Sequence, residues 1–229
     1  MVNFFQCIVS PFIYLKTIVL SLFLEYDIQK RLYQIEEYEK IDLYLLSLYK
    51  KKNPYTISKE FAFLHHHGNL YTFGPSPLQL YEKIHQDWIG DNPLSFLELG
   101  CGTSRGLLYL YFFSNCKVFG VDWNDEFILK AKKTLKLFEV NHVKVWKEDY
   151  LSLPHYKYDM IYLFELFLEK ESLIKLLERL YHESLSHTQI ITTSFPLSDF
   201  DSRYIVKKKF EFRFFFGKST VYLNTKKVL

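Results

Sequence analysis

The chain of 229 residues is poor in cysteine and glycine and nearly balanced in charge. Its three cysteines, Cys7, Cys101 and Cys116, are too few and too widely spaced for a disulfide framework or a cysteine-based metal site. We therefore expect reduced thiols, and the cytoplasm or the cytoplasmic face of a membrane as the compartment. The formal net charge of only +3 gives no argument for nucleic acid, so we expect no nucleic-acid partner.

Clusters of metal-ligating residues are also scarce. Three consecutive histidines at positions 65–67 are the nearest approach to a ligand cluster. Adjacent residues of a regular element cannot all point at one ion, and no acid or cysteine stands at ligand spacing from them. We therefore expect no metal site, and we expect the histidines to lie at a surface or a helix end.

An apolar run at positions 4–24 contains a single charge, Lys16. A membrane-spanning helix needs about 20 apolar residues, and here Lys16 and Pro11 interrupt the run. A secretory signal would need a basic start and a small-residue cleavage site, neither of which is present. Membrane contact, spanning or interfacial, and packing on the rest of the protein therefore stay open as alternatives.

One stretch combines a strand with a glycine-rich turn. Residues 95–99 form an apolar run with Glu98 near its end, and Gly100, Cys101 and Gly102 follow directly. Glycines allow a turn to adopt dihedrals closed to other residues and allow a ligand to approach the backbone N–H groups closely. The pattern predicts a ligand site where a strand meets a helix.

The details of this turn select the kind of ligand. A dinucleotide site would have its third glycine where this chain has Arg105, and here Gly106 comes one position later, where it would let the following helix pack tightly on the sheet. Glu98 would repel a pyrophosphate and attract a cation. The next apolar run, residues 117–121, is followed by Asp122, which can accept hydrogen bonds from both hydroxyls of a ribose. The pattern therefore predicts a cofactor that carries a nucleoside and a positive charge.

These motifs resemble motif I and the second-strand acid of the class I, seven-strand methyltransferases, whose donor is S-adenosyl-L-methionine. The resemblance implies that Glu98 and the glycine turn hold the methionine part and Asp122 the ribose. By the same resemblance, an acid after the third strand accepts the adenine amino group, and the segment before motif I folds over the methionine part. The positions that match these further roles are Phe73, Gly74, Ser76, Trp123, Asp149 and Tyr150.

Strand and helix patterns alternate through the rest of the chain. Strands are expected at 95–99, 117–121, 142–146, 158–164 and 189–195, with helices between them, and this alternation predicts a parallel sheet. Residues 205–215 and 220–224 are typical of an antiparallel hairpin. We therefore predict an α/β fold, a Rossmann-like seven-stranded sheet with a C-terminal hairpin. The expected domains are a helical extension at 1–70 and a methyltransferase domain at 71–229. A helix at 78–88, with Pro77 as its first residue, leads into the sheet.

The residues after the fourth predicted strand are informative about the methyl acceptor. DNA amino-methylases often carry Asp/Asn-Pro-Pro-Tyr/Phe there, whereas this chain has Leu163-Phe164-Glu165-Leu166. Glu165 is therefore a candidate for orienting or deprotonating an amine acceptor, with a surface acid at a helix start as the alternative.

A narrower resemblance joins the chain to the small lysine methyltransferases of the ATP-synthase-c-subunit type, and it implies a protein lysine as acceptor. It rests on the apolar run at 4–24, Gly74-Pro75-Ser76-Pro77, the glycine turn, and Ser194-Phe195-Pro196-Leu197. The departures from this family are Thr103 for an acid and Ser104 for a glycine. The alternatives are a small-molecule or lipid methyltransferase, a nicotinamide-dependent oxidoreductase, and a non-catalytic adaptor with this fold.

Overall fold

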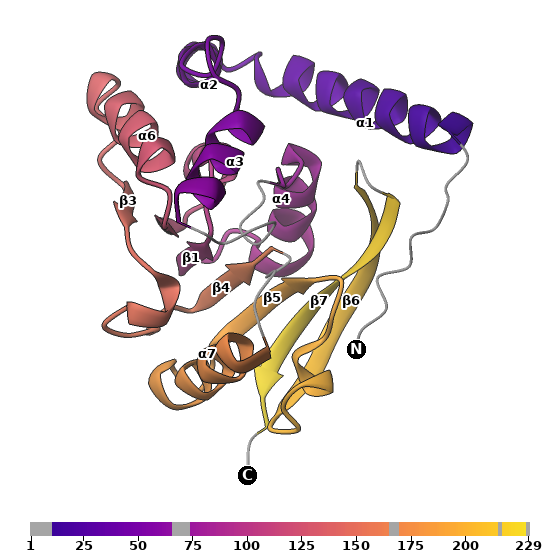
Figure 1. The fold of residues 1–229 in the computed structure, drawn as a ribbon, viewed down its shortest axis with the longest axis vertical. Coiled ribbons are helices and arrows are strands. Elements are labelled where there is room, and N and C mark those ends of the chain that lie inside the picture. The colour runs from indigo at the N-terminus through magenta and orange to yellow at the C-terminus, as the bar shows by residue number, and fades with distance from the viewer. Residues whose placement is uncertain (1–10, 66–73, 165–169, 215–216, 228–229) are drawn as a thin grey trace.

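A computed structural model describes residues 11–65, 74–164, 170–214 and 217–227. Its centre is a seven-stranded sheet in the order β3-β2-β1-β4-β5-β7-β6 (Figure 1). The first five strands in sequence are parallel, and β7 runs antiparallel to both of its neighbours. This arrangement confirms the predicted fold class. The bounds are β1 Ser95–Leu99, β2 Lys117–Asp122, β3 Val143–Lys147, β4 Met160–Leu163, β5 Gln189–Thr193, β6 Tyr204–Phe214 and β7 Gly217–Lys226.

Helices cover the two faces of the sheet unequally. One hydrophobic cluster contains buried side chains from the first six helices together with one face of the strands. The second cluster, on the opposite face, draws on the last helix. Short turns complete the chain: a π-helical turn η1 His85–Ile89, and 3-10 turns η2 Tyr150–Ser152 and η3 Leu197–Asp199. The helices are α1 Pro11–Leu32, α2 Glu36–Ser47, α3 Pro54–Leu64, α4 Leu78–Ile84, α5 Arg105–Phe113, α6 Asp125–Leu137 and α7 Lys170–Glu183.

Helix α6 shows how local sequence sets an element. The Asn124 side chain accepts a hydrogen bond from the backbone N–H of Glu126 at 3.1 Å and so caps the helix. Phe127, Ile128 and Ala131 are buried on one side because their spacing of three to four residues places them on one helical face.

The helix that leads into the sheet differs in two details from the prediction. The helix expected at 78–88 is α-helical only to Ile84 and continues as the π-helical turn η1. Pro77 is the N-cap and not the first helical residue, since its ψ of 147° is extended. In the N-terminal segment, a break after Leu32 separates α1 from α2.

The N-terminal helices share the core of the sheet. Ile28 of α1, Ile41 and Leu45 of α2 and Ile57 of α3 are each at most 1% exposed, in the same cluster as Phe96 of β1. A polar contact joins the same regions, because Lys52 Nζ lies 2.7 Å from carboxylates of both α3 and α6. The division into domains at residue 70 stays a prediction.

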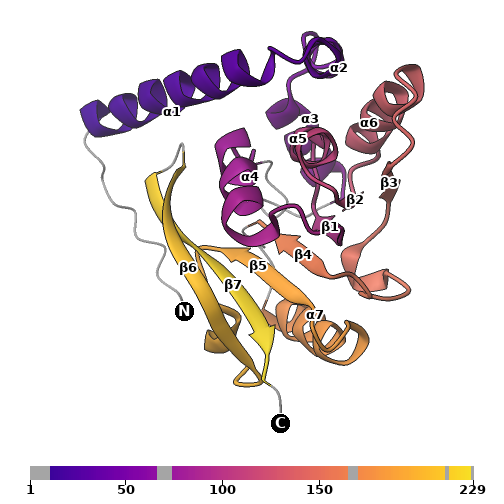
Figure 2. The same cartoon turned by 180° about the vertical axis from the view of Figure 1, so that it is seen from behind.

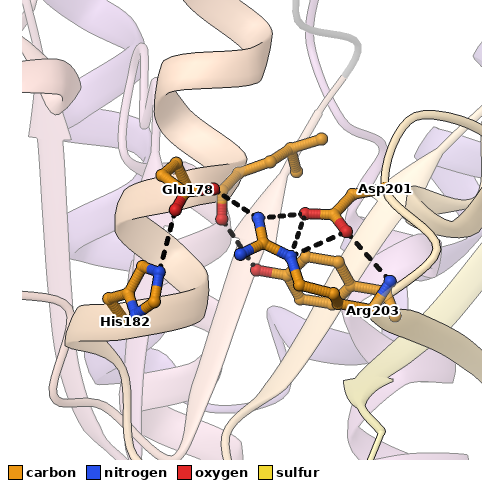
Figure 3. Close-up of polar contacts among 6 residues, drawn as sticks. Glu178, His182, Asp201 and Arg203 are labelled. Atoms are coloured by element: carbon orange, nitrogen blue, oxygen red, sulfur yellow. Dashed lines mark hydrogen bonds and ion pairs between the residues drawn. The ribbon is translucent and has the colours of Figure 1, made fainter.

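The start of the C-terminal hairpin is fastened to α7. The Arg203 guanidinium pairs with Asp201 and with Glu178 of α7, and Glu178 also contacts His182 at 2.8 Å (Figure 3). The Tyr204 hydroxyl donates to the carbonyl of Leu177 at 3.0 Å. These contacts hold one end of the hairpin against α7.

Helix α1 carries an exposed apolar stripe. Val19, Leu22, Phe23 and Tyr26 are 57–66% exposed, and their spacing places them on one helical face. Within the described ranges, no helix has both the length and the hydropathy needed to cross a bilayer. Part of the membrane prediction rests on residues 4–10 and on the side chains of residues 11–18 and 21, which lie outside what the structure describes.

Candidate functional site

The glycine turn lies between the ends of β1 and β2. Gly100 and Gly102 have φ values of +82° and +49°, a region that favours glycine. The N–H groups of Gly100 and Cys101 donate to the carbonyl of Val121 at 2.8 and 2.9 Å. The Gly102 N–H donates to Asp122 Oδ2 at 2.8 Å. The turn therefore offers a ligand close approach, but, contrary to expectation, these three N–H groups are already bonded to β2.

Asp122 is held in place by two backbone donors. Its Oδ2 accepts from Gly102, and its Oδ1 accepts from the N–H of Asn124 at 2.8 Å. Burial raises the pKa of Asp122 to about 6, while the two N–H bonds act in the opposite direction. Each carboxylate oxygen keeps a further lone pair, so the group is oriented and still able to accept from two vicinal hydroxyls.

Glu98 is a buried carboxyl with one unpartnered oxygen. It is 3% exposed, and its Oε1 accepts a 2.6 Å hydrogen bond from the Tyr81 hydroxyl. Its Oε2 is buried and has no hydrogen-bond partner within the described part of the chain. Burial raises the pKa of Glu98 to about 8, the Tyr81 bond lowers it, and Asp122 raises it further. A positively charged ligand group would satisfy this oxygen, so the site fits a cationic cofactor.

Gly106 makes room for the ring that holds Glu98. A Cβ built on Gly106 would lie 1.9 Å from Cζ of Tyr81. The sequence predicted that this glycine would allow α5 to pack on the sheet. The structure corrects the contact, because the side chain that needs the space comes from α4.

We expect Gly106→Ala to lower the free energy of unfolding by about 2 kcal/mol, through overpacking against Tyr81. Urea denaturation measures this loss. If the clash is its cause, the double variant Gly106→Ala/Tyr81→Leu loses less than the two single variants together. An unchanged unfolding free energy for Gly106→Ala would contradict the assignment.

The lead-in segment meets the end of β4. The Ser76 hydroxyl lies 2.8 Å from the Tyr162 hydroxyl, and a Cβ built on Gly74 would lie 3.1 Å from the Phe164 ring. Tyr162 is the register partner of Glu98 across β1 and β4. Gly74 and Ser76 therefore lie at the same sheet edge as the glycine turn. Phe73 and Glu165, the other two candidates in this region, lie outside the described residues.

The candidates for the adenine end follow β2 and β3. Asp149 is half-buried, and its carboxylate accepts the N–H of Leu151 at 2.8 Å. Tyr150, which follows it, packs partly buried against the second core cluster. Trp123 lies against α3, with ring centroids 5.7 Å from Phe61 and 5.8 Å from His65. Contact of Asp149, Tyr150 and Trp123 with an adenine stays a prediction.

Sequence reasoning missed the partners of Arg105. The guanidinium donates to both carboxylate oxygens of Asp42 at 2.7 Å and to Glu25 at 2.8 Å. The Tyr33 hydroxyl adds a 2.7 Å bond to Asp42. The sequence showed Arg105 only as a missing glycine, because acids 63 and 80 residues upstream give no local signal. Tyr81 was missed for the same reason.

Within the described residues, no group of three His, Cys, Asp or Glu side chains is placed so that it could hold a metal ion. His65 stacks on Phe61 with ring centroids 4.0 Å apart, and its Nδ1 lies 2.9 Å from the Phe61 carbonyl oxygen. The other two histidines of the cluster, His66 and His67, lie outside the described residues.

Solved structures share this fold at low sequence identity. The tRNA methyltransferase TrmK of B. subtilis has a TM-score of 0.53 at 14% identity, over 66% of this chain and 65% of that one. An RNA methyltransferase from Salinibacter ruber, crystallised with S-adenosyl-L-homocysteine, has a TM-score of 0.55 at 15% identity, over 68% and 95%. TrmN from Thermus thermophilus has a TM-score of 0.53 at 12% identity, over 74% and 53%.

The shares covered differ between these structures: the chain spans just under two thirds of TrmK and about half of TrmN. No curated protein matches it in sequence. The family described as "Methyltransferase domain" matches residues 91–207, just over half of the chain. That range runs from the residues before β1 into β6 and contains the glycine turn, Asp122 and Asp149. The chain belongs to the methyltransferase-domain family, and its fold is that of the class I methyltransferases.

Proposed function

We propose that the methyl donor lies across the ends of β1, β2 and β3. The single observation that carries this placement is the Asp122 carboxylate, fixed by Gly102 and Asn124 beside the glycine turn. In this placement Asp122 accepts from the ribose hydroxyls and Asp149 from the adenine amino group. The unpartnered Oε2 of Glu98 supports a cationic methionine part on the other side of the turn.

In this proposal the residues act by positioning the methyl donor and the acceptor. The bound donor supplies a methyl group on a sulfonium, which an acceptor attacks in line. The chain fixes the donor at its ribose and holds the lead-in over β4 through Ser76 and Tyr162. A proton has to be removed only if the acceptor arrives protonated, and Glu165 is the candidate for that role. The methionine end would thus be enclosed by residues from β1, β4 and the lead-in.

We expect donor binding to release a proton near pH 7. Because the pKa of Glu98 is about 8 without ligand, most molecules carry the proton at pH 7, and a nearby ligand cation favours the carboxylate. Affinity for S-adenosylhomocysteine, which carries an ammonium, should therefore rise between pH 6 and pH 8. Calorimetry in two buffers of different ionisation enthalpy measures the released proton.

Glu98→Gln is the matched variant, since it keeps the shape of the side chain and removes the titration. It should release less proton and show a flatter pH dependence. Equal release by both proteins would overturn the contact with Glu98. Titration with NADH in the same experiment tests the oxidoreductase alternative, which predicts saturable binding of NADH and none of S-adenosylhomocysteine.

Two classes of methyl acceptor are supported by observations on this chain. The resemblance to the small lysine methyltransferases supports a protein lysine, and the charge on the C-terminal hairpin, described below, supports RNA. Transfer of a tritiated methyl group to lysate components, followed by protease or ribonuclease digestion, separates the two classes. Label that resists both enzymes and extracts into organic solvent would indicate a lipid or small-molecule acceptor. No transfer to any component would support the adaptor alternative.

The membrane contact expected for residues 4–24 is a further proposal, supported by the exposed stripe on α1. We expect the full chain to sediment with phosphatidylcholine–phosphatidylglycerol vesicles, and the variant Val19→Ser/Leu22→Ser/Phe23→Ser to lose most of this binding. The control is Leu129→Ser/Leu137→Ser, which changes exposed leucines of α6. Failure of the unaltered chain to sediment would contradict the proposal.

A further inference from the structure

The charge of the protein is concentrated in the C-terminal hairpin. Strands β6 and β7 contain six basic residues and one acid, which gives them a formal charge of +5. The whole chain has a charge of +3, so the rest of the chain is net negative. The even balance of the sequence therefore hides a basic element. Its basic residues are Lys207, Lys208, Lys209, Arg213, Lys218 and Lys226.

The two faces of the hairpin differ. Phe210 lies 4.8 Å from the Trp88 ring, and Phe214 is fully buried, so this face packs toward α4 and η1. Side chains alternate along a strand, so Lys209 and Arg213 point to the opposite face. Their register partners on β7 are Tyr222 and Lys218. The second face of the hairpin thus presents three cations, one acid (Glu211) and a tyrosine.

This second face extends beyond the last helix. In Figures 1 and 2, α7 lies near β5 and the lower end of the hairpin, while β6 and β7 continue upward toward α1. Lys209, Arg213 and Lys218 are all exposed. Among the described residues, the ion pair that involves these three is that of Lys218 with Glu211, at 3.6 Å. By contrast, Arg203 at the base of the hairpin is already held by two acids.

The second face of the hairpin reaches the side of the sheet at which the parallel strands end, where the proposed donor site lies. The N–H of Ser194, directly after β5, donates to the carbonyl of Thr220 at 2.9 Å, so the start of β7 lies at the end of β5. The Phe214 and Phe164 rings are 5.7 Å apart, which places the end of β6 beside the end of β4. Arg213 and Lys218 therefore lie at the same edge as the glycine turn.

We propose that this face of the β6–β7 hairpin binds the phosphate backbone of RNA and brings it to the donor site; the second part rests on the proposed function. From Lys209 to Arg213 the strand spans about 13 Å, a length over which a nucleic-acid duplex presents on the order of eight phosphates. Tyr222 offers a ring on which an unpaired base can stack. Anionic lipid headgroups would also attract these cations, but Lys209, Arg213 and Lys218 supply no large apolar side chain that could insert into the bilayer as well.

Fluorescence anisotropy with a labelled RNA stem-loop that has single-stranded ends tests the proposal. The variant Lys209→Gln/Arg213→Gln/Lys218→Gln should bind the RNA at least tenfold more weakly at 100 mM salt. The slope of its plot of log affinity against log salt concentration should be shallower by about two to three, as expected for three lost phosphate contacts. The matched control is Lys132→Gln/Lys133→Gln/Lys136→Gln, which removes the same charge from exposed positions of α6. The control should stay within twofold of the unaltered chain.

The outcomes separate this proposal from its rivals. Equal weakening by both triple variants would show a general charge effect and overturn it, as would the absence of RNA binding by the unaltered chain. Binding to phosphatidylserine vesicles but not to RNA would assign the face to a membrane. Calorimetry with S-adenosylhomocysteine serves as the separate test of the donor site, because the hairpin variant should keep its donor affinity. If the unaltered chain did not bind S-adenosylhomocysteine, the proposed donor site would be overturned, whereas the test of RNA binding by the hairpin would be unaffected.

Discussion

Replacing Arg105 with leucine should lower the free energy of unfolding by about 3–5 kcal/mol, the range for an ion pair broken inside a protein. Asp42, its partner, has a side chain only 1% exposed. Without the guanidinium, the Asp42 carboxylate would stay buried with the Tyr33 hydroxyl as its remaining bond. The apolar contacts that leucine gains do not offset an unpaired charge in that position.

Urea denaturation of Arg105→Leu and of the double variant Arg105→Leu/Asp42→Asn measures this effect. Because the double variant removes the unpaired charge, it should regain part of the loss. The control is Glu36→Gln, which breaks the exposed pair with Lys40 and should cost less than about 1 kcal/mol. A loss of the same small size for Arg105→Leu would show that the network does not hold the N-terminal helices.

Asp122→Ala should weaken binding of S-adenosylhomocysteine by about 100-fold or more. Two hydrogen bonds from ribose hydroxyls to a carboxylate are lost, each with a contribution of about 1.5–3 kcal/mol, and 1.4 kcal/mol corresponds to a factor of ten. The substitution also frees the N–H groups of Gly102 and Asn124, so the turn loses its link to β2. The fall in affinity therefore combines a lost contact with a less ordered site.

Isothermal calorimetry on folded protein measures this change, with thermal unfolding as the check on the fold. The matched control is Asp125→Ala, three residues along the chain, whose side chain is 58% exposed and which should leave the affinity unchanged. Unchanged affinity in folded Asp122→Ala would remove this residue from the donor site.

The parts of the fold that follow local rules were predictable. The five parallel strands and the hairpin each appear in the sequence as apolar runs bounded by turn residues. The Asn124 cap and the positions of Gly100 and Gly102 follow from single-residue preferences. These features depend on neighbours within a few residues, so the chain displays them directly.

The unpredicted parts depend on side chains that meet across the fold. The bond from Tyr81 to Glu98 and the space left by Gly106 require α4 to lie against the start of α5. Nothing in the spacing of Leu78–Ile84 shows where its tyrosine ring will point. The basic hairpin was also unpredicted, because the net charge of +3 is the sum of +5 on the hairpin and a negative charge on the rest of the chain.

Arg105 also interacts with the dipole of helix α5. It is the first residue of that helix, and a positive side chain at a helix N-terminus is opposed by the helix dipole. The first turn of α5 has no acidic residue, and Ser104 makes no capping bond with its side chain. Asp42 and Glu25 supply the negative charge that this end lacks, from helices far upstream in sequence. The N-terminal helices thus act as an electrostatic cap for the helix that follows the glycine turn.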